Sequence, residues 1–406
     1  MSFISIIRNW IWLSECIDYT SISNVLERFE NPENVYVASE EELRKVISKK
    51  ECDKILQKDF SKADEILNDC FEKEITVFSI NDSMYPDLLR NINNPPLVLY
   101  MKGRMPDLDT KVAINIIGTR QATLYGKMVT KKLTHILAKE GVIIVSGMAA
   151  GIDTIANKEA ILAKTPTIAV LGCSVDYCYP AENRYLMDDI IAVGAVISEY
   201  PPTTKPLPMN FPQRNRIMSG LCRGVLVVEA PKKSGTLITA SYALEQGRDI
   251  FAVPGNIDNP NAQGCNELIK IGAKMVTSPY DVLSEYENEL GNKEDRLTVR
   301  NEFNVFVVGK EQNKSRAKAN NIRKQKSAQV EYENKEEKKL SPPKKRQDMS
   351  ANESIIYDII ASGADIFDEI IEKSNLSASE VMMTITMLEI NGDVTQNENR
   401  IKIKEN

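Results

Sequence analysis

The chain has 406 residues, of which 42 % are apolar and 27 % charged, and its formal net charge is −6. This composition is typical of a globular protein with two or three domains, and it excludes fibrous, collagen-like and coiled-coil proteins. Seven scattered cysteines without a C-x-x-C pair argue against a disulfide framework and a zinc site, and they indicate the reducing cytoplasm. With one histidine, His135, two-histidine metal sites are excluded, and any Ser-His or Cys-His dyad must use it.

The N-terminal part of the chain, residues 1–102, carries a net charge of −6 and contains no glycine. Its apolar stretch at residues 3–13 is too short for a membrane span and is interrupted by Arg8, so we expect a buried amphipathic helix rather than an export signal. Helical patterns around residues 23–29 and 40–50 predict a small helical N-terminal domain followed by a connector.

The central part, residues 103–290, has a different pattern. Sixteen of the nineteen glycines fall between Gly103 and Gly291, as in folds with many tight loops between buried elements. Because apolar strands that alternate with helices form parallel sheets, this segment predicts an α/β domain with a doubly wound parallel sheet. The expected strands are residues 112–117, 142–145, 167–171, 195–197, 225–228, 250–253 and 274–276.

The C-terminal part divides into a linker and a small domain. Residues 291–347 are predicted to be a flexible linker, and their larger part, 309–347, has a net charge of +8. Residues 348–406 have a net charge of −8 and predict a winged-helix domain. Its expected elements are helices at residues 353–361, 366–374 and 377–391 and a hairpin with strands at 393–396 and 400–404.

The third helix of the predicted winged-helix domain occupies the position that reads DNA in such folds, but it carries two glutamates and no lysine or arginine. We therefore expect this domain to bind a protein partner or regulate the chain itself. Its apolar residues Val381, Met382, Ile385 and Leu388 are expected to fill a small core, and Met383 and Met387 to offer a partner surface.

Three loops that follow expected strands combine small and basic residues, namely 118–120, 146–153 and 231–236. Ligands of doubly wound sheets bind at the carboxyl ends of the strands, where helix N-termini supply positive potential. Between the second and third of these loops, residues 211–216 contain two arginines and an aromatic residue. We expect these segments to form a phosphate-binding edge, with Phe211 and Tyr125 available for base stacking.

Alternatives to a binding site remain open for each of these features. A glycine-containing turn after a strand is by itself more often a packing feature than a site. The dinucleotide fingerprint G-x-G-x-x-G and the motif G-x-x-x-x-G-K-[ST] are absent, so the sequence gives no support to NAD binding or Walker-type ATP hydrolysis. His135 is expected to be a surface or packing residue, and Cys173 and Cys178 to be incidental thiols rather than a redox pair.

Taken together, these motifs resemble one family in their order along residues 80–285. They are Tyr85-Pro86 with Leu88, Pro95-Pro96, Gly118-Thr119-Arg120, Ser146-Gly147-x-Ala149-x-Gly151-Ile152-Asp153, Tyr179-Pro180, Ser198-Glu199, Phe211-Pro212-x-Arg214-Asn215-Arg216-Ile217, Glu229-Ala230, Ser234-Gly235-Thr236-Leu237-Ile238-Thr239-Ala240 and Val253-Pro254-Gly255. The sequence resembles the DNA-processing protein A family, DprA/Smf. The resemblance implies an extended Rossmann domain that binds single-stranded DNA, forms homodimers and loads the RecA recombinase in natural transformation, without enzymatic activity and without a cofactor or metal.

The resemblance also implies site residues. Arg120 matches a basic DNA-phosphate ligand, the turn that begins at Ser146 matches the phosphate cradle, and the other two basic segments match further DNA contacts. Two departures from the family pattern are Ala150 in place of an arginine and Asn157 in place of a histidine. The expected DNA-binding residues are Gly118, Thr119, Arg120, Ser146, Gly147, Gly151, Ile152, Phe211, Arg214, Asn215, Arg216, Lys233, Ser234, Gly235 and Thr236.

Two other function classes compete with a DNA-binding recombination mediator. One is a nucleotide hydrolase of the lysine-decarboxylase-like type, which would need a catalytic carboxylate where this chain has Thr239. The other is a regulatory protein that acts through its winged helix, whose negative charge opposes contact with DNA.

Overall fold

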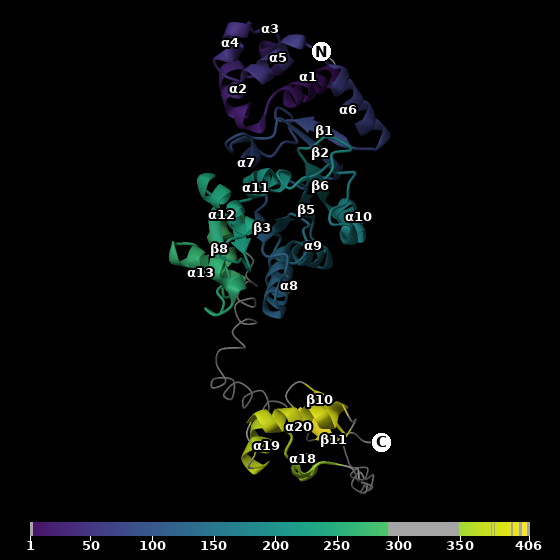
Figure 1. Ribbon diagram of the computed structural model, residues 1–406, viewed down its shortest axis with the longest axis vertical. Helices are drawn as coiled ribbons and strands as arrows, with labels where there is room; N and C mark the ends of the chain where they lie inside the picture. Colours follow the sequence, from purple (N-terminus) through teal and green to yellow (C-terminus); the bar gives the residue numbers. More distant parts are fainter. Residues whose placement is uncertain are drawn as a thin grey trace, which may run out of the picture. The chain divides into compact units, whose positions relative to one another are not determined.

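The computed structural model describes residues 3–290, 349–374, 376, 378–390, 393–397 and 400–403 (Figure 1). It separates into two compact units, Met1–Glu311 and Gln312–Asn406. The linker predicted at residues 291–347 lies outside the described residues. No helix in the described part is long and apolar enough to cross a membrane.

The first unit begins with a helical layer, as expected. The apolar run at its start forms α1 (Phe3–Cys16), whose residues Trp10, Ile11 and Leu13 are buried. The pattern at residues 40–50 forms two helices rather than one, because Ser48 and Glu51 build a capping box that starts a new helix. The remaining helices of this layer are α2 (Ile22–Phe29), α3 (Pro32–Val37), α4 (Glu40–Arg44), α5 (Lys49–Gln57) and α6 (Ser61–Glu72).

A nine-stranded sheet follows, in the order β1-β2-β6-β5-β4-β3-β7-β8-β9. The predicted parallel sheet is confirmed, since the seven strands from β6 to β9 in that order pair in parallel. The first two strands, β1 (Thr76–Ser79) and β2 (Val98–Gly103), pair antiparallel and extend the sheet beyond β6. Both strands lie within residues 1–102, which were predicted to be a helical domain and a connector. The last part of that segment therefore belongs to the sheet. The predicted strands are β3 (Ala113–Ile117), β4 (Ile143–Ser146), β5 (Thr167–Val170), β6 (Ala195–Ser198), β7 (Gly224–Val227), β8 (Asp249–Ala252) and β9 (Lys274–Met275).

Helices cover both faces of the sheet. Alternate residues of β3 belong to different apolar clusters: Ile114 and Ile116 pack with α8 (Leu124–Lys139) and α9 (Ile152–Leu162), whereas Ile117 shares a cluster with the other face. The sheet is therefore buried on both sides, as its continuous apolar strands predicted. The other helices are α7 (Asp87–Arg90), α10 (Arg184–Val193), α11 (Asn210–Gly220), α12 (Gly235–Glu245), α13 (Gln263–Lys270), α14 (Tyr280–Leu283) and α15 (Glu287–Leu290).

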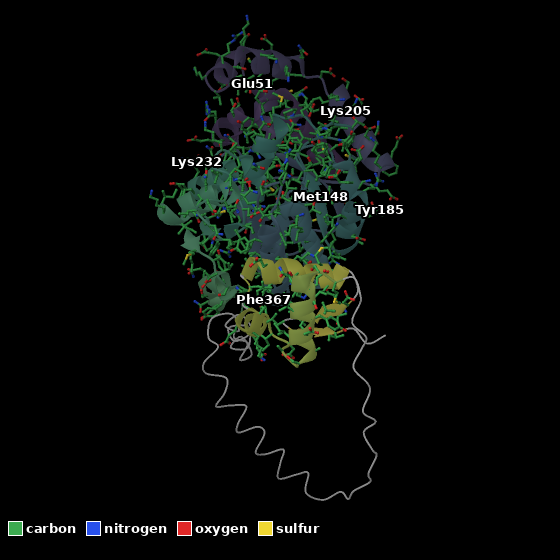
Figure 2. All side chains as sticks on the ribbon, turned by 60° about the horizontal axis from the view of Figure 1, so that its bottom comes forward. Glu51, Met148, Tyr185, Lys205, Lys232 and Phe367 are labelled. Atoms are coloured by element: carbon green, nitrogen blue, oxygen red, sulfur yellow. The ribbon has the colours of Figure 1, made fainter. Side chains whose placement is uncertain are left out.

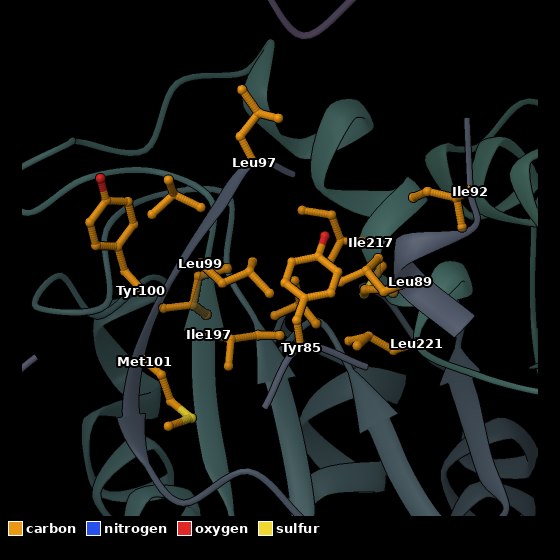
Figure 3. Packing of buried hydrophobic residues seen from close by; sticks show 14 of the residues in the cluster. Tyr85, Leu89, Ile92, Leu97, Leu99, Tyr100, Met101, Ile197, Ile217 and Leu221 are labelled. Atoms are coloured by element: carbon orange, nitrogen blue, oxygen red, sulfur yellow. The ribbon is translucent and has the colours of Figure 1, made fainter. Parts of the chain in front are cut away.

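The connector, here the segment that joins β1 to β2, packs on α11 (Figure 3). Tyr85 and Leu89 are buried against Ile217 and Leu221 of that helix, and the Tyr85 hydroxyl donates a hydrogen bond to the Pro96 carbonyl at 2.8 Å. A helix wedged in this way between the connector and the sheet has little freedom to shift. The connector thus fixes α11, which carries part of the site described below.

The second unit is the predicted winged helix. Its helices α18 (Ala351–Ala361), α19 (Phe367–Ser374) and α20 (Ala378–Ile390) and its hairpin β10 (Val394–Asn397) and β11 (Arg400–Ile403) agree with the expected elements. Val381, Ile385 and Leu388 are buried in a separate small core, and Met387 is 47 % exposed. The side chains of Met382 and Met383 lie outside the described part.

Candidate nucleic-acid interface

A pocket of about 640 Å³ opens at the carboxyl ends of β3 and β7. These neighbouring strands mark the point where the strand order reverses, because the chain proceeds from β3 to β4 on one side and adds β7 on the other. Ligands of open α/β sheets bind at this point. The pocket lies where the sequence predicted the ligand-binding edge.

The turn after β4 forms the support below the pocket. The Ser146 hydroxyl donates to the Ile116 carbonyl at 2.7 Å, which ties this turn to β3. Gly151 has a φ of 85°, and a Cβ atom there would stand 2.4 Å from the Thr119 carbonyl oxygen. Glycine is therefore required for the turn to fit against the loop that carries Arg120.

Two buried charged side chains, Asp153 and Arg214, hold this turn through its backbone groups. The Gly147 N–H donates to Asp153 Oδ2 at 3.1 Å, and Arg214 Nη1 donates to the Gly147 carbonyl at 3.0 Å and to the Val170 carbonyl. Burial raises the pKa of Asp153 to about 6, while the Arg214 charge and backbone N–H groups oppose the rise. Burial also lowers the pKa of the Arg214 guanidinium. Both side chains line the pocket, but their hydrogen bonds point into the protein.

An aromatic pair forms one wall. The ring centroids of Tyr179 and Phe211 are 5.4 Å apart, and Phe211 fits because Gly172 beside it has no side chain. The guanidinium carbons of Arg120 and Arg214 lie 5.7 and 5.9 Å from the Phe211 ring centroid. Arg120 is exposed, so its charge remains accessible to a ligand next to an aromatic surface.

The start of α12 forms the opposite wall. Ser234 occupies the N-cap position, yet its hydroxyl oxygen is buried and has no hydrogen-bond partner in the described part of the chain. The first N–H groups of a helix lack partners within the helix and attract anions. A Cβ atom at Gly235 would meet nothing within 4 Å, so this glycine leaves open space in front of the helix start. The pocket is therefore lined at this point by a helix start, by an unpartnered serine and by open space at Gly235.

The structure brings most of the predicted site residues together and places the rest around them. Ser146, Gly147, Gly151 and Ile152 do not line the pocket but support it from below. Lys233 is exposed and lies outside the lining, and its neighbour Lys232 is likewise at the surface, whereas Met148 lies inside the unit (Figure 2). The predicted residues that line the pocket are Gly118, Thr119, Arg120, Phe211, Arg214, Asn215, Ser234, Gly235 and Thr236.

The role expected for Arg216 needs correction. Its side chain is 2 % exposed, and its Nη2 donates to Glu199 Oε2 at 2.6 Å. It does not line the pocket. A guanidinium held in this buried ion pair does not reach a phosphate at the surface, so Arg216 stabilises the packing of α11 instead. Tyr125 also lies outside the pocket, and its hydroxyl donates to the Pro254 carbonyl at 3.0 Å.

Several lining residues were not among the predicted site residues, including Asp153, Tyr179 and Thr239. Asp153 and Tyr179 stood within the family motifs, so the motifs themselves were the available signal. Thr239, where a hydrolase would need a carboxylate, is 2 % exposed. Asn157, one of the two departures from the family pattern, is buried and donates to Thr167 Oγ1 at 2.9 Å, away from the pocket.

His135, Cys173 and Cys178, which the sequence analysis did not assign to the site, also lie where packing explains them. His135 is partly exposed, and its Nδ1 lies 3.5 Å from Glu159 Oε2. Cys173 and Cys178 are free thiols, and burial raises the pKa of Cys173 to about 12. A thiol with a raised pKa is a poor nucleophile, so these residues contribute to packing.

Comparison with known proteins agrees with this geometry. The family model described as DNA recombination-mediator protein A matches residues 76–287, and the DprA winged helix domain matches residues 340–399. The DNA processing protein DprA of Bacillus subtilis is 45 % identical over 214 residues, which cover 53 % of this chain and 72 % of that protein. The DprA of Streptococcus pneumoniae is 45 % identical over 210 residues, covering 52 % and 74 %. The X-ray structure of DprA from Streptococcus pneumoniae superposes with a TM-score of 0.62 and 36 % identity, covering 69 % of this chain and 98 % of that one. The chain thus belongs to the DNA recombination-mediator protein A (DprA) family.

Proposed function

We propose that this protein binds single-stranded DNA in the pocket at the ends of β3 and β7 and delivers it to the RecA recombinase during natural transformation. The observation that carries the proposal is that Arg120, Ser234 with its unpartnered hydroxyl and the N-terminus of α12 line one pocket. This donor set suits a phosphate group, because it supplies a positive charge and hydrogen-bond donors.

The aromatic wall favours a nucleic acid over a free phosphate. Single-strand binding proteins combine cationic contacts to the backbone with aromatic rings on which bases stack. Tyr179 is 39 % exposed beside Phe211, so a ring face is available within the same pocket as Arg120. Binding of this kind has little sequence preference, as a recombination mediator requires.

We further propose that the protein is not an enzyme. Thr239 offers no general base, and the Asp153 carboxylate is already engaged by the Gly147 N–H and faced by the Arg214 charge. The proposal includes a homodimer, the RecA recombinase as protein partner and action in the cytoplasm, as the family resemblance implies.

The proposal is tested by titrating single- and double-stranded oligonucleotides over a salt series. Wild type is expected to prefer the single strand, and Arg120→Ala to lower both the affinity and the salt slope, the latter by about 0.7. Arg28→Ala is the matched control, since Arg28 is 59 % exposed and lies in the N-terminal helical layer. Equal binding by wild type and Arg120→Ala would refute the proposed site.

Two further assays separate a mediator from a hydrolase. Release of base or phosphate from nucleotides is expected to stay at background with wild type. RecA filament formation on single-stranded DNA coated with a single-strand-binding protein is expected to accelerate with wild type and less with Arg120→Ala. Nucleotide turnover that disappears in a Lys233→Ala variant would overturn the non-catalytic assignment.

A further inference from the structure

Helix α8 carries an unusual charge. It contains Lys127, Lys131, Lys132 and Lys139 and no acidic residue, and no other helix in the described part of the chain combines four basic residues with none that is acidic. The domain around it is neutral over residues 103–308. The positive charge on this helix is therefore local and not a reflection of a basic domain.

The lysines of α8 lie on one face. At 100° per residue, Lys127, Lys131 and Lys139 fall within the same arc as Leu124 and Met128. All of these side chains are exposed, whereas the opposite face, with Thr130, Leu133 and Leu137, is buried on the sheet. Within the described residues, no ion pair joins Lys127, Lys131 or Lys139 to a carboxylate. We call Leu124, Lys127, Met128, Lys131 and Lys139 the α8 stripe.

The α8 stripe begins at the rim of the pocket. Arg120 and Gln121 line the pocket, and Thr123 caps α8 two residues later. The Thr123 N–H donates to Glu229 Oε2 at 2.9 Å, and Glu229 follows β7, whose loop forms the other side of the pocket. Because Glu229 is 2 % exposed, the start of α8 is fixed relative to the pocket. From Lys127 to Lys139 the helix extends roughly 18 Å farther.

From this continuity we propose that the α8 stripe is a second binding surface for single-stranded DNA, along which the strand runs after it leaves the pocket. This inference rests on the proposed function of the pocket. The three lysines contact phosphates, and Leu124 and Met128, which are 75 % and 62 % exposed, provide an apolar surface for the first bases outside the pocket. The pocket then holds one short segment of the DNA strand, and the α8 stripe binds the nucleotides that follow it, so that the total bound length exceeds what the pocket alone can hold.

The charge of the neighbouring groups agrees with a polyanion as the occupant. On the adjacent helix α9, Glu159 lies against His135 at 3.5 Å, so that carboxylate faces the histidine. Uniform positive charge on an exposed helix repels itself and is favoured when a polyanion covers it. An acidic protein surface would offer the same charge, and the experiments below distinguish it.

The first experiment compares two lengths of oligothymidine, 4 and 25 nucleotides, as ligands of the full chain. The variant carries Lys127→Gln, Lys131→Gln and Lys139→Gln together. Its matched control carries Lys49→Gln, Lys50→Gln and Lys270→Gln, which remove three exposed lysines elsewhere. The stripe variant is expected to bind the 25-mer on the order of tenfold more weakly at 0.1 M salt, with a salt slope smaller by about 2, and to bind the 4-mer like wild type.

The outcomes separate this inference from the proposed function. If wild type binds neither oligonucleotide, the proposed function fails. If wild type binds both and the stripe variant matches the control on the 25-mer, the α8 stripe does not bind DNA, and an acidic protein becomes its expected partner. A loss of affinity for both lengths in the stripe variant would likewise overturn the assignment, because the stripe would then act through the pocket.

A second measurement needs no variant. Lysine acetylation of the wild-type protein, followed by mass spectrometry, reports which amines a ligand covers. The 25-mer is expected to protect Lys127, Lys131 and Lys139 at least severalfold and to leave Lys49 and Lys50 unchanged, whereas the 4-mer protects none of them. Equal labelling of the three stripe lysines with and without the 25-mer would contradict the proposal.

Discussion

The arginines show how burial separates residues that look equivalent in the sequence. Arg214 and Arg216 stand two positions apart, and from the motif both were expected to contact DNA. In the structure Arg214 lines the pocket but donates to backbone carbonyls inside the protein, while Arg216 pairs with Glu199. Arg216 and its partner Glu199 are 17 residues apart, and no local sequence pattern reveals an ion pair over that distance. The exposed Arg120, in contrast, could be predicted as a DNA contact from its loop.

Arg216→Ala is expected to lower the free energy of unfolding by about 3–5 kcal/mol, because it leaves the Glu199 carboxylate buried without its partner. Urea denaturation measures this change, with Arg28→Ala as an exposed control expected to shift it by less than about 0.5 kcal/mol. A variant with wild-type stability and lost DNA affinity would restore Arg216 as a DNA ligand.

Asp153 is expected to make stability depend on pH. Its pKa is raised from 3.8 to about 6 by burial, so the native state favours the protonated carboxyl. The stabilisation is fully present below pH 4 and is lost as the pH rises through 6, with a size on the order of 3 kcal/mol. Between pH 4.5 and pH 7.5 the free energy of unfolding of wild type should therefore fall relative to that of Asp153→Asn. A constant difference would show that Asp153 keeps its ordinary pKa.

At the scale of elements, the apolar periodicity predicted the seven parallel strands and the winged helix, because continuous buried runs between helices have few other interpretations. The strands β1 and β2 were missed. Residues 97–101 are all apolar and β2 is buried on both faces, but the absence of glycine and the helical patterns before it pointed to helices. The pairing of β2 with β6 is antiparallel and distant in sequence, so local patterns did not reveal it.

Two glycines of the pocket region are expected to respond differently to a methyl group. At Gly147 the added Cβ would stand 2.6 Å from Arg214 Nη1 and 2.7 Å from Asp153 Oδ2, so Gly147→Ala should cost about 1–3 kcal/mol of stability. At Gly235 the space is open, so Gly235→Ala should change stability by less than about 0.5 kcal/mol.

The Gly147→Ala and Gly235→Ala variants also test whether the open space at Gly235 binds a phosphate group. Gly235→Ala places a methyl group where a phosphate would approach the start of α12, and single-strand affinity should fall on the order of tenfold, as for one lost hydrogen bond to a charged group. Thermal unfolding and oligonucleotide titration of both variants provide the measurements. Unchanged affinity in Gly235→Ala would mean that the ligand does not contact this helix.

At the scale of the whole molecule, the two units have separate cores. The core of the second unit is built from its own helices and hairpin, including Ile356, Ile370 and Leu388. A fragment of residues 349–406 is therefore expected to unfold in one cooperative transition by circular dichroism and, because residues 348–406 carry a charge of −8, to leave single-stranded DNA unbound at physiological salt.

The complementary fragment completes this prediction. A chain that ends at residue 348 keeps the pocket and the basic segment, so its single-strand affinity should stay within about threefold of the full chain. Detectable DNA binding by the 349–406 fragment would contradict the protein-partner role expected for the winged helix.

The two margins of the sheet limit how copies of this protein can associate. One margin is β1, with four residues, and the other is β9, with two. Unpaired backbone groups on long edge strands allow sheets to join between molecules, a route to fibres and swapped assemblies, and strands this short offer very few of them. We therefore expect contacts between copies of the first unit to run through side chains on helices and loops, which can be altered by surface mutation without changing the backbone hydrogen bonds of this sheet. Even in concentrated solution, assemblies that grow by pairing of edge strands of this sheet are disfavoured.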